Sequence, residues 1–264
     1  MAKKIELLIG GDLSNQITIT NFAAKYFEIP FLGLYNACAT FAESLLIAGN
    51  FVENKTIKNS IVITSSHNLN AERQFRFPIE YGAPKAQTTT FTATGAVGAI
   101  VTNEKSKIKL ESATIGNVID YDQCDATHMG AVMTPAAVQV LMKHLNDLER
   151  KADYYDVILT GDLGKYGLEI VKDYMCCEHN IELSNYNDCG VMLYNLEKQK
   201  EVHAGGSGPV CSALVVYSYI YNLLLKKKLK RVLFLATGAL FSPLLLYQKE
   251  NINSICHAIS LEVV

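Results

Sequence analysis

Short apolar runs alternate with longer amphipathic stretches along this chain of 264 residues. In the first third, residues 5–9, 31–35 and 61–65 are predicted as buried strands, and β-branched side chains are frequent in the last of them. Helices are predicted between these strands over residues 14–26 and 39–52. Buried strands separated by helices of this length indicate an α/β protein with a central sheet.

The second part of the chain repeats the first. Two strand segments recur, and in each half a turn of small residues opens a long apolar helix before the next strand. Such a repeat predicts two duplicated α/β halves related by a pseudo-two-fold axis. The matching pairs are Leu7–Leu13 with Val157–Leu163, Lys58–Ser65 with Lys230–Thr237, and the turn at 36–39 with the turn at 205–208.

We expect the first half to span residues 1–102 and the second half residues 154–264, joined by a connecting segment over residues 103–153. Residues 94–101 are predicted to close the first half as a strand, and residues 256–264 to close the second.

Two uncharged stretches, residues 209–225 and 232–248, approach the minimum length of a membrane span. The first contains several polar side chains, and the second is interrupted by Gly238 and Pro243. We therefore predict a buried helix and a buried strand followed by a turn. The basic cluster Lys226–Arg231 follows the first stretch, where it would complement a helix dipole; a docking patch for anionic lipid is the alternative.

The composition of the chain argues against a nucleic-acid-binding protein and against a zinc site. A net charge of -2 gives no general attraction to nucleic acid. The seven cysteines are irregularly spaced and include no CxxC pair, which is typical of thiols in a reducing compartment and not of a zinc site. Asp122, Asp125 and His128 are grouped loosely but fit no standard metal-binding spacing. We predict no metal and no cofactor.

Cys38 is the first residue to consider for chemistry. It follows a predicted strand, begins a predicted helix and is flanked by Ala37 and Ala39. A helix N-terminus stabilises a thiolate, and small neighbours give a ligand access to the sulfur. An isolated thiol is also commonly a buried structural residue, so both interpretations stay open at this point.

Residues 35–40, set in a duplicated α/β chain, resemble the nucleophile elbow of thiolases and ketoacyl synthases. The resemblance implies a layered helix–sheet–helix–sheet–helix fold. In ketoacyl synthase III it also implies a catalytic His near residues 159–164 and an Asn near residues 205–208; neither is present here. His203 resembles part of a Gly-His-Pro loop of degradative thiolases, so an acyltransferase in which His203 activates Cys38 is the alternative function.

The chain is similar from end to end to the stage V sporulation protein AD family. The most specific match runs from Thr64 to Gly82, and the resemblance implies that family members begin with a strand and helix that this chain lacks. The matching segments include Gly11–Leu13, Ile29–Phe31, Ala37–Thr40, Thr64–Asn68, Ala71–Arg76, Glu80–Gly82, Met133–Ala137, Asp156–Leu163, Asp188–Gly190, Ala204–Gly208 and Ala236–Leu240.

This resemblance implies a spore protein that binds dipicolinic acid, free or as its calcium chelate, and takes part in its uptake into the developing forespore. It implies a homodimer formed through the first half, other stage V sporulation A membrane proteins as partners, and a cytoplasmic, peripheral position at the inner forespore membrane. Arg73 and Arg76 could clamp carboxylates, or form structural ion pairs with Glu72 or Glu80. The expected ligand-binding residues are Cys38, Ser65, Ser66, His67, Arg73, Arg76, Gly206 and Ser207.

Overall fold

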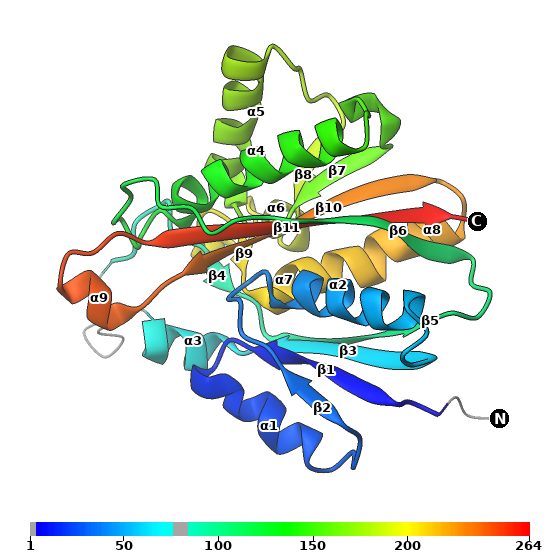
Figure 1. Cartoon of the computed structure of the whole chain (residues 1–264). Helices are drawn as coiled ribbons and strands as arrows, with labels where there is room; N and C mark the ends of the chain where they lie inside the picture. Colours follow the sequence, from blue (N-terminus) through cyan, green and yellow to red (C-terminus); the bar gives the residue numbers. More distant parts are fainter. Residues whose placement is uncertain (1–3, 76–83) are drawn as a thin grey trace.

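The computed structural model describes residues 4–75 and 84–264. Two mixed sheets lie one above the other, with helices between them and on both outer faces (Figure 1). This is the helix–sheet–helix–sheet–helix arrangement expected from the sequence. Both sheets carry the apolar strands that the hydrophobic pattern predicts.

The first sheet has the strand order β2-β1-β3-β5. The central strand β1 pairs in parallel with β2 and β3, and β5 runs antiparallel to β3. The strands are β1 Leu7–Asp12, β2 Phe31–Gly33, β3 Asn59–Ser66 and β5 Gly95–Thr102.

The second sheet has the order β6-β11-β10-β7-β8. Strands β8, β7 and β10 are parallel, whereas β11 runs antiparallel to both of its neighbours. The strands are β6 Ile108–Ile115, β7 Val157–Thr160, β8 Tyr186–Asp188, β10 Arg231–Leu240 and β11 Asn253–Val263.

The two halves are duplicated, as the sequence repeat predicts. The order and directions of β8-β7-β10-β11 match those of β2-β1-β3-β5, so the repeated segments form corresponding strands. The second sheet has in addition β6 and the helix α4, Met129–Asp147, which packs against β10 and β11. Both come from residues 103–153, so much of the expected connecting segment is built into the second sheet.

The central layer contains α2, Thr40–Glu53, and a continuous helical stretch made of α7, Pro209–Leu214, a π-helical turn over Val215–Ile220, and α8, Tyr221–Leu225. Helices between two sheets bury much of their surface, which is why residues 209–225 carry no charged side chain. The predicted buried helix is confirmed. No helix in the described part of the chain has the length and apolar composition needed to cross a bilayer.

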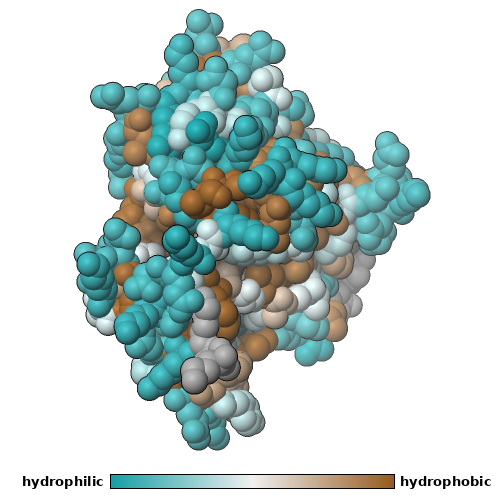
Figure 2. All heavy atoms as spheres, turned by 90° about the vertical axis from the view of Figure 1, so that its right-hand side faces the viewer, coloured by the Kyte–Doolittle hydropathy of each residue, from teal (hydrophilic) through white to brown (hydrophobic). Residues whose placement is uncertain are grey.

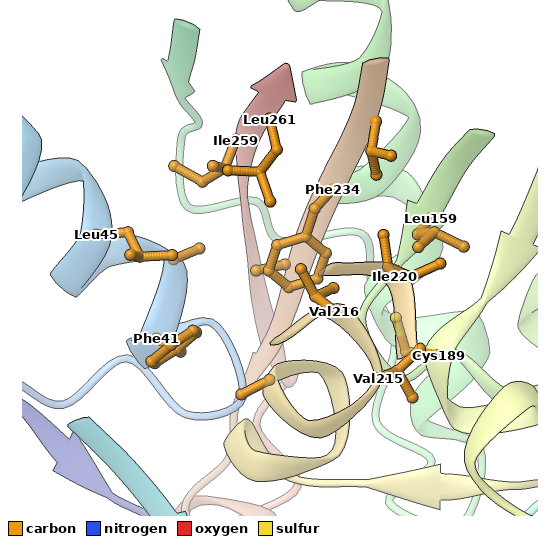
Figure 3. Close-up of a cluster of buried hydrophobic side chains, with 14 of the residues drawn as sticks. Phe41, Leu45, Leu159, Cys189, Val215, Val216, Ile220, Phe234, Ile259 and Leu261 are labelled. Atoms are coloured by element: carbon orange, nitrogen blue, oxygen red, sulfur yellow. The ribbon is translucent and has the colours of Figure 1, made fainter. Parts of the chain in front are cut away.

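A large core cluster holds the central layer between the sheets (Figure 3). Phe41 and Leu45 of α2 face Phe234 of β10 from one side, and Val216 and Ile220 approach it from the other. Phe234 is fully buried. Burying an aromatic side chain of this size against aliphatic neighbours stabilises the fold by about 2–3 kcal/mol relative to exposure.

The outer layers and connections complete the fold. Helix α1 begins four residues later than the sequence suggests, after a 3-10 turn, Asn15–Ile17, in which Gln16 and Ile17 have positive φ. The buried strand predicted within residues 232–248 is confirmed as β10, whereas the predicted turn contains the short helix α9. The remaining elements are α1 Thr18–Ala24, α3 Asn68–Phe75, α5 Gly164–His179, α6 Cys189–Leu193, α9 Pro243–Tyr247, the 3-10 turns Ala152–Tyr154 and Lys200–Val202, and the short strands β4 Phe91–Thr92 and β9 Gly206–Ser207.

Candidate functional site

A cavity of about 580 Å³ lies where the two halves meet, between α3, the start of α2, the start of α4 and the α9 region. This volume is within the usual range for small-molecule sites. The walls are mainly apolar, and Cys38 and Ser207 are among the lining residues. The principal apolar side chains of the wall are Leu13, Phe75, Met133, Phe241, Leu246 and Tyr247.

Cys38 sits in a tight elbow between β2 and α2. Ala37 has a positive φ of 48°, and the Thr40 hydroxyl accepts a hydrogen bond from the Asn36 amide at 2.9 Å while donating to the Ala37 carbonyl at 2.7 Å. Strand β10 packs directly on this elbow, because a Cβ at Gly238 would lie 2.9 Å from the Asn36 carbonyl oxygen. The elbow therefore depends on small residues on both sides.

Asp162 faces the Cys38 thiol from the second half. It lies in the turn after β7, is 1% exposed, and accepts hydrogen bonds from the Ser207 hydroxyl, the Gly208 amide and the Thr237 hydroxyl, each at 3.0 Å. Gly208 has a φ of 97°, a conformation that favours glycine, so the amide can point at the carboxylate. Two separate segments, residues 207–208 and β10, thus hold one buried carboxyl group beside the thiol.

This environment works against a thiolate. Burial raises the pKa of Cys38 well above its ordinary value, and the charge and hydrogen bonding of Asp162 raise it further; the Gly208 amide and the Ser207 hydroxyl oppose these effects only in part. Burial also raises the pKa of Asp162. A thiol protonated at neutral pH is a weak nucleophile.

Other polar groups line the cavity more sparsely. On α3, Glu72 is 5% exposed and pairs with Lys85 at 2.9 Å; these are the charged residues of the described cavity wall. Asn68 on the same helix donates to the Thr92 carbonyl at 3.3 Å. The part of the cavity wall that the structure describes thus offers one ion pair, a few hydrogen-bonding groups and a large apolar surface.

The structure brings some of the expected site residues together. Cys38 and Ser207 line the cavity. Gly206 is buried next to Ser207 in β9 and pairs with Phe91. Ser66 is buried behind that strand, where its hydroxyl donates to the Ala93 carbonyl at 2.8 Å.

The other expected site residues lie farther from the cavity. Ser65 is part of β3, paired with Asp12 and Ala96. His67 and Arg73 are exposed and are not among the residues that line the cavity. Arg76 lies outside the described residues.

His203 also does not line the cavity or contribute to the pKa of Cys38, and its Nδ1 is buried without a partner among the described residues.

Sequence reasoning did not assign roles in the cavity to Asp162 or to the pair of Glu72 and Lys85. A signal for Asp162 exists in the repeat, since Gly-Asp-Leu occurs at residues 11–13 and 161–163. Asp12 is equally buried, and it accepts from the Ser14 and Thr20 amides at 2.8 and 2.7 Å. A polar residue kept in a buried position in both halves indicates a specific hydrogen-bonding role.

The fold is that of the thiolase-like condensing enzymes. The chain superimposes on 3-oxoacyl-[acyl-carrier-protein] synthase III from Aquifex aeolicus VF5 with a TM-score of 0.60 at 13% identity, covering 98% of this chain and 77% of the other. A variant of OleA from Xanthomonas campestris, solved with bound cerulenin, gives a TM-score of 0.62 at 15% identity and covers 98% and 73%. At this level of identity the similarity concerns the fold.

The family model of stage V sporulation protein AD matches residues 1–262. The chain is also 43% identical over 258 residues to the stage V sporulation protein AD of Bacillus subtilis (strain 168), covering 98% of this chain and 76% of the relative. The chain therefore belongs to the stage V sporulation protein AD family.

Proposed function

We propose that this protein binds dipicolinic acid reversibly in the cavity beside Cys38, and that it serves the uptake of dipicolinate into the forespore during sporulation. The observation that carries the proposal is the pairing of the Cys38 thiol with a buried carboxyl group, Asp162, at the floor of an apolar cavity. Family membership supplies the link to sporulation.

The same pairing argues against condensation chemistry. A condensing cysteine needs a base or cation that stabilises its thiolate, and donors that stabilise the oxyanion. Asp162 has the opposite effect on the thiol, because a carboxylate next to it raises its pKa. The acyltransferase alternative requires His203 to reach Cys38, and His203 lies outside the cavity wall.

The cavity suits a flat aromatic dianion in several respects. Its apolar walls can accept a pyridine ring, and Lys85, although paired with Glu72, can also contact one carboxylate. Glu72 beside Lys85 would offer oxygen ligands to the metal if dipicolinate enters as its calcium chelate. In this proposal Lys85 contacts the ligand carboxylate, a role that the sequence suggested for Arg73, whose side chain is exposed.

Membrane association and self-association belong to the same proposal. We expect a peripheral protein on the cytoplasmic side of the inner forespore membrane, working with other stage V sporulation A membrane proteins. A homodimer through the first half is supported by the apolar surface of α1 and the turn after it, where Phe22 is 69% and Tyr26 is 82% exposed.

Calorimetric titration of dipicolinate tests the binding site. The parent and Cys38→Ala should bind similarly, because the cavity is needed and the thiolate is not. Cys38→Leu should abolish binding by filling the floor of the cavity. Lys85→Ala should weaken it by about ten- to a hundredfold, the usual cost of one charge-assisted contact. Lys198→Ala, an exposed lysine outside the cavity wall, is the matched control.

Two outcomes would contradict the proposal. The first is an absence of heat with dipicolinate up to millimolar concentrations in the parent protein. The second is rapid acylation of Cys38 by acyl-CoA donors, detected by mass spectrometry and abolished by His203→Ala, which would instead support the acyltransferase alternative.

A further inference from the structure

One end of the molecule carries a dense group of lysines, which we call the lysine face. Figure 1 shows that the starts of β3 and β10, the loop between β5 and β6, the end of α8 and the C-terminus meet at this end. All ten lysines of the face are exposed. They are Lys4, Lys55, Lys58, Lys105, Lys107, Lys109, Lys226, Lys227, Lys228 and Lys230.

Hydrogen bonds show that these segments are neighbours although they are far apart in sequence. The Asn59 side chain donates to the Lys4 carbonyl at 3.4 Å, and the Asn103 amide donates to the Lys58 carbonyl at 3.4 Å. At the C-terminus, the Val264 amide donates to the Lys107 carbonyl at 3.0 Å, and the preceding amide donates to the Lys230 carbonyl at 2.9 Å. The lysines therefore form one continuous surface across both sheets.

Acidic side chains at this end only partly offset the charge. Glu262 bridges Lys109 and Arg231, both at 3.1 Å. Asp156 accepts from the backbone amides of Lys230 and Arg231, and Glu6 accepts from the amide of Lys58, so these two carboxylates are engaged by main-chain groups. Glu6, Asp156 and Glu262 are therefore among the acidic residues that lie at this end.

The charge of the chain is thus unevenly distributed. The whole sequence has 24 basic and 26 acidic residues, and ten of its lysines lie on this one face. A protein with a net charge of -2 would be repelled weakly by an anionic surface on average, so the asymmetry would orient it with the lysine face forward.

We propose that the lysine face docks on the surface of an anionic phospholipid bilayer. Clustered lysines near a membrane surface bind anionic lipid electrostatically, with contributions that add from residue to residue. Leu225 is 39% exposed beside the lysines, so it can enter the interfacial layer. Figure 2 faces this end of the molecule and shows hydrophilic surface interrupted by apolar patches.

Lipid explains this surface better than nucleic acid does. Sites for single-stranded nucleic acid combine positive charge with exposed aromatic rings for base stacking, and arginine supplies the specific contacts to bases. The basic side chains that define the lysine face are lysines, and the neighbouring Arg231 is paired with Glu262. The cavity opens at the other end of the strands, near α3 and α9, so docking would leave it accessible (Figure 1).

Flotation with phospholipid vesicles tests the proposal. The full chain should float with phosphatidylcholine vesicles that contain phosphatidylglycerol, stay behind with pure phosphatidylcholine, and be released by high salt. Changing Lys226, Lys227, Lys228 and Lys230 together to Glu should reduce the partition coefficient by at least about tenfold. A control with the same change in net charge replaces Lys172, Lys198, Lys200 and Lys249 by Glu and should bind almost like the parent.

The two quadruple variants separate a localised face from a general effect of charge. Equal loss of binding in both would refute a localised face, as would binding to pure phosphatidylcholine or tighter binding to duplex DNA than to vesicles. Melting curves and dipicolinate titrations of both variants separate this proposal from the ligand proposal. Loss of vesicle binding with normal dipicolinate affinity supports the lysine face whatever the fate of the proposed function.

Discussion

Asp162→Asn gives a direct test of the electrostatics around Cys38. The substitution removes the negative charge that faces the thiol and retains an oxygen that can accept hydrogen bonds from Ser207, Gly208 or Thr237. The pKa of Cys38 should fall, because the carboxylate is one of the causes that raise it. Burial is the larger cause, and it remains, so the thiol should still have a pKa above that of a free cysteine.

The size of the effect follows from the contact. A carboxylate in contact with a thiol disfavours the thiolate, so removing its charge lowers the pKa of the thiol. Because alkylation proceeds through the thiolate, the rate below the pKa should rise with the thiolate fraction, by about tenfold or more in the variant.

Iodoacetamide labelling followed by peptide mass spectrometry measures this rate at each cysteine separately. Cys124, Cys176 and Cys177 are exposed and serve as internal references that should label equally in both proteins, whereas Cys189 is buried and should stay unlabelled unless the variant unfolds. Two results would refute the reasoning: labelling of Cys38 in the parent as fast as that of Cys124, or no acceleration in a folded Asp162→Asn variant.

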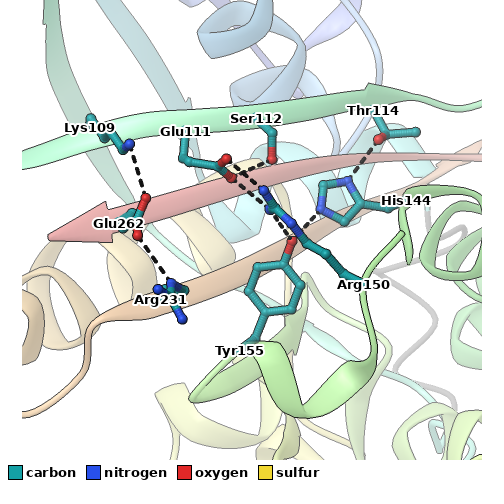
Figure 4. Close-up of polar contacts among 9 residues, drawn as sticks. All are labelled: Lys109, Glu111, Ser112, Thr114, His144, Arg150, Tyr155, Arg231 and Glu262. Atoms are coloured by element: carbon teal, nitrogen blue, oxygen red, sulfur yellow. Dashed lines mark hydrogen bonds and ion pairs between the residues drawn. The ribbon is translucent and has the colours of Figure 1, made fainter. Parts of the chain in front are cut away.

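Two further predictions concern the stability of the fold at low pH and the self-association of the chain. Arg150 forks onto Glu111 and holds the pKa of that carboxyl at about 2, while burial lowers the pKa of His144 to about 4 (Figure 4). The stability contributed by the ionised Glu111 carboxylate is present above its ordinary pKa and is lost as pH falls through about 2. The stability contributed by the neutral His144 imidazole is present above pH 6.5 and is lost as pH falls through about 4. Urea denaturation between pH 7 and pH 2 should show both losses of stability. Glu111→Gln should lower the free energy of unfolding at pH 7 by about 1–2 kcal/mol and weaken the loss of stability near pH 2. A variant with the same pH profile as the parent would contradict the role of Glu111. For self-association, light scattering at micromolar concentration should give the mass of two chains, and Phe22→Glu with Tyr26→Glu should give that of one; a monomeric parent would count against the dimer.

The strands and their order follow well from the sequence, because buried parallel strands are continuous apolar runs and the repeat sets their equivalence. The segment 103–153 is harder to assign. Strand β6 alternates polar and apolar residues and is rich in charge near its start, and its place depends on pairing with β11, about 150 residues later. A single-sequence pattern carries local periodicity but gives no information on such distant pairings.

The candidate site likewise has features that local sequence patterns predict and contacts that they do not. Arg73 is a predicted ligand-binding residue, and the phase of helix α3 places it away from the cavity wall. Asn68, Glu72 and Phe75 line the cavity at helical spacing, whereas Arg73 is rotated about 100° from Glu72 and faces solvent. The resemblance of residues 35–40 to a nucleophile elbow could predict that the site lies near this elbow and near the turn at residues 205–208. The contact between Cys38 and Asp162 could not be predicted, because it joins two halves whose relative placement the sequence does not state.

The Asp residues in the two copies of the Gly-Asp-Leu motif make different contacts. Asp12 is satisfied within its own half, by groups of Ser14 and Thr20 that fix the start of α1. Asp162 is held from the turn before α7 and from β10, and it remains directed at the thiol of the other half. A buried carboxyl group in that position keeps the thiol protonated and leaves the cavity intact. If the protein binds and releases its ligand unchanged, as we propose, an unreactive thiol in the cavity wall is an advantage for reversible binding over acyl transfer.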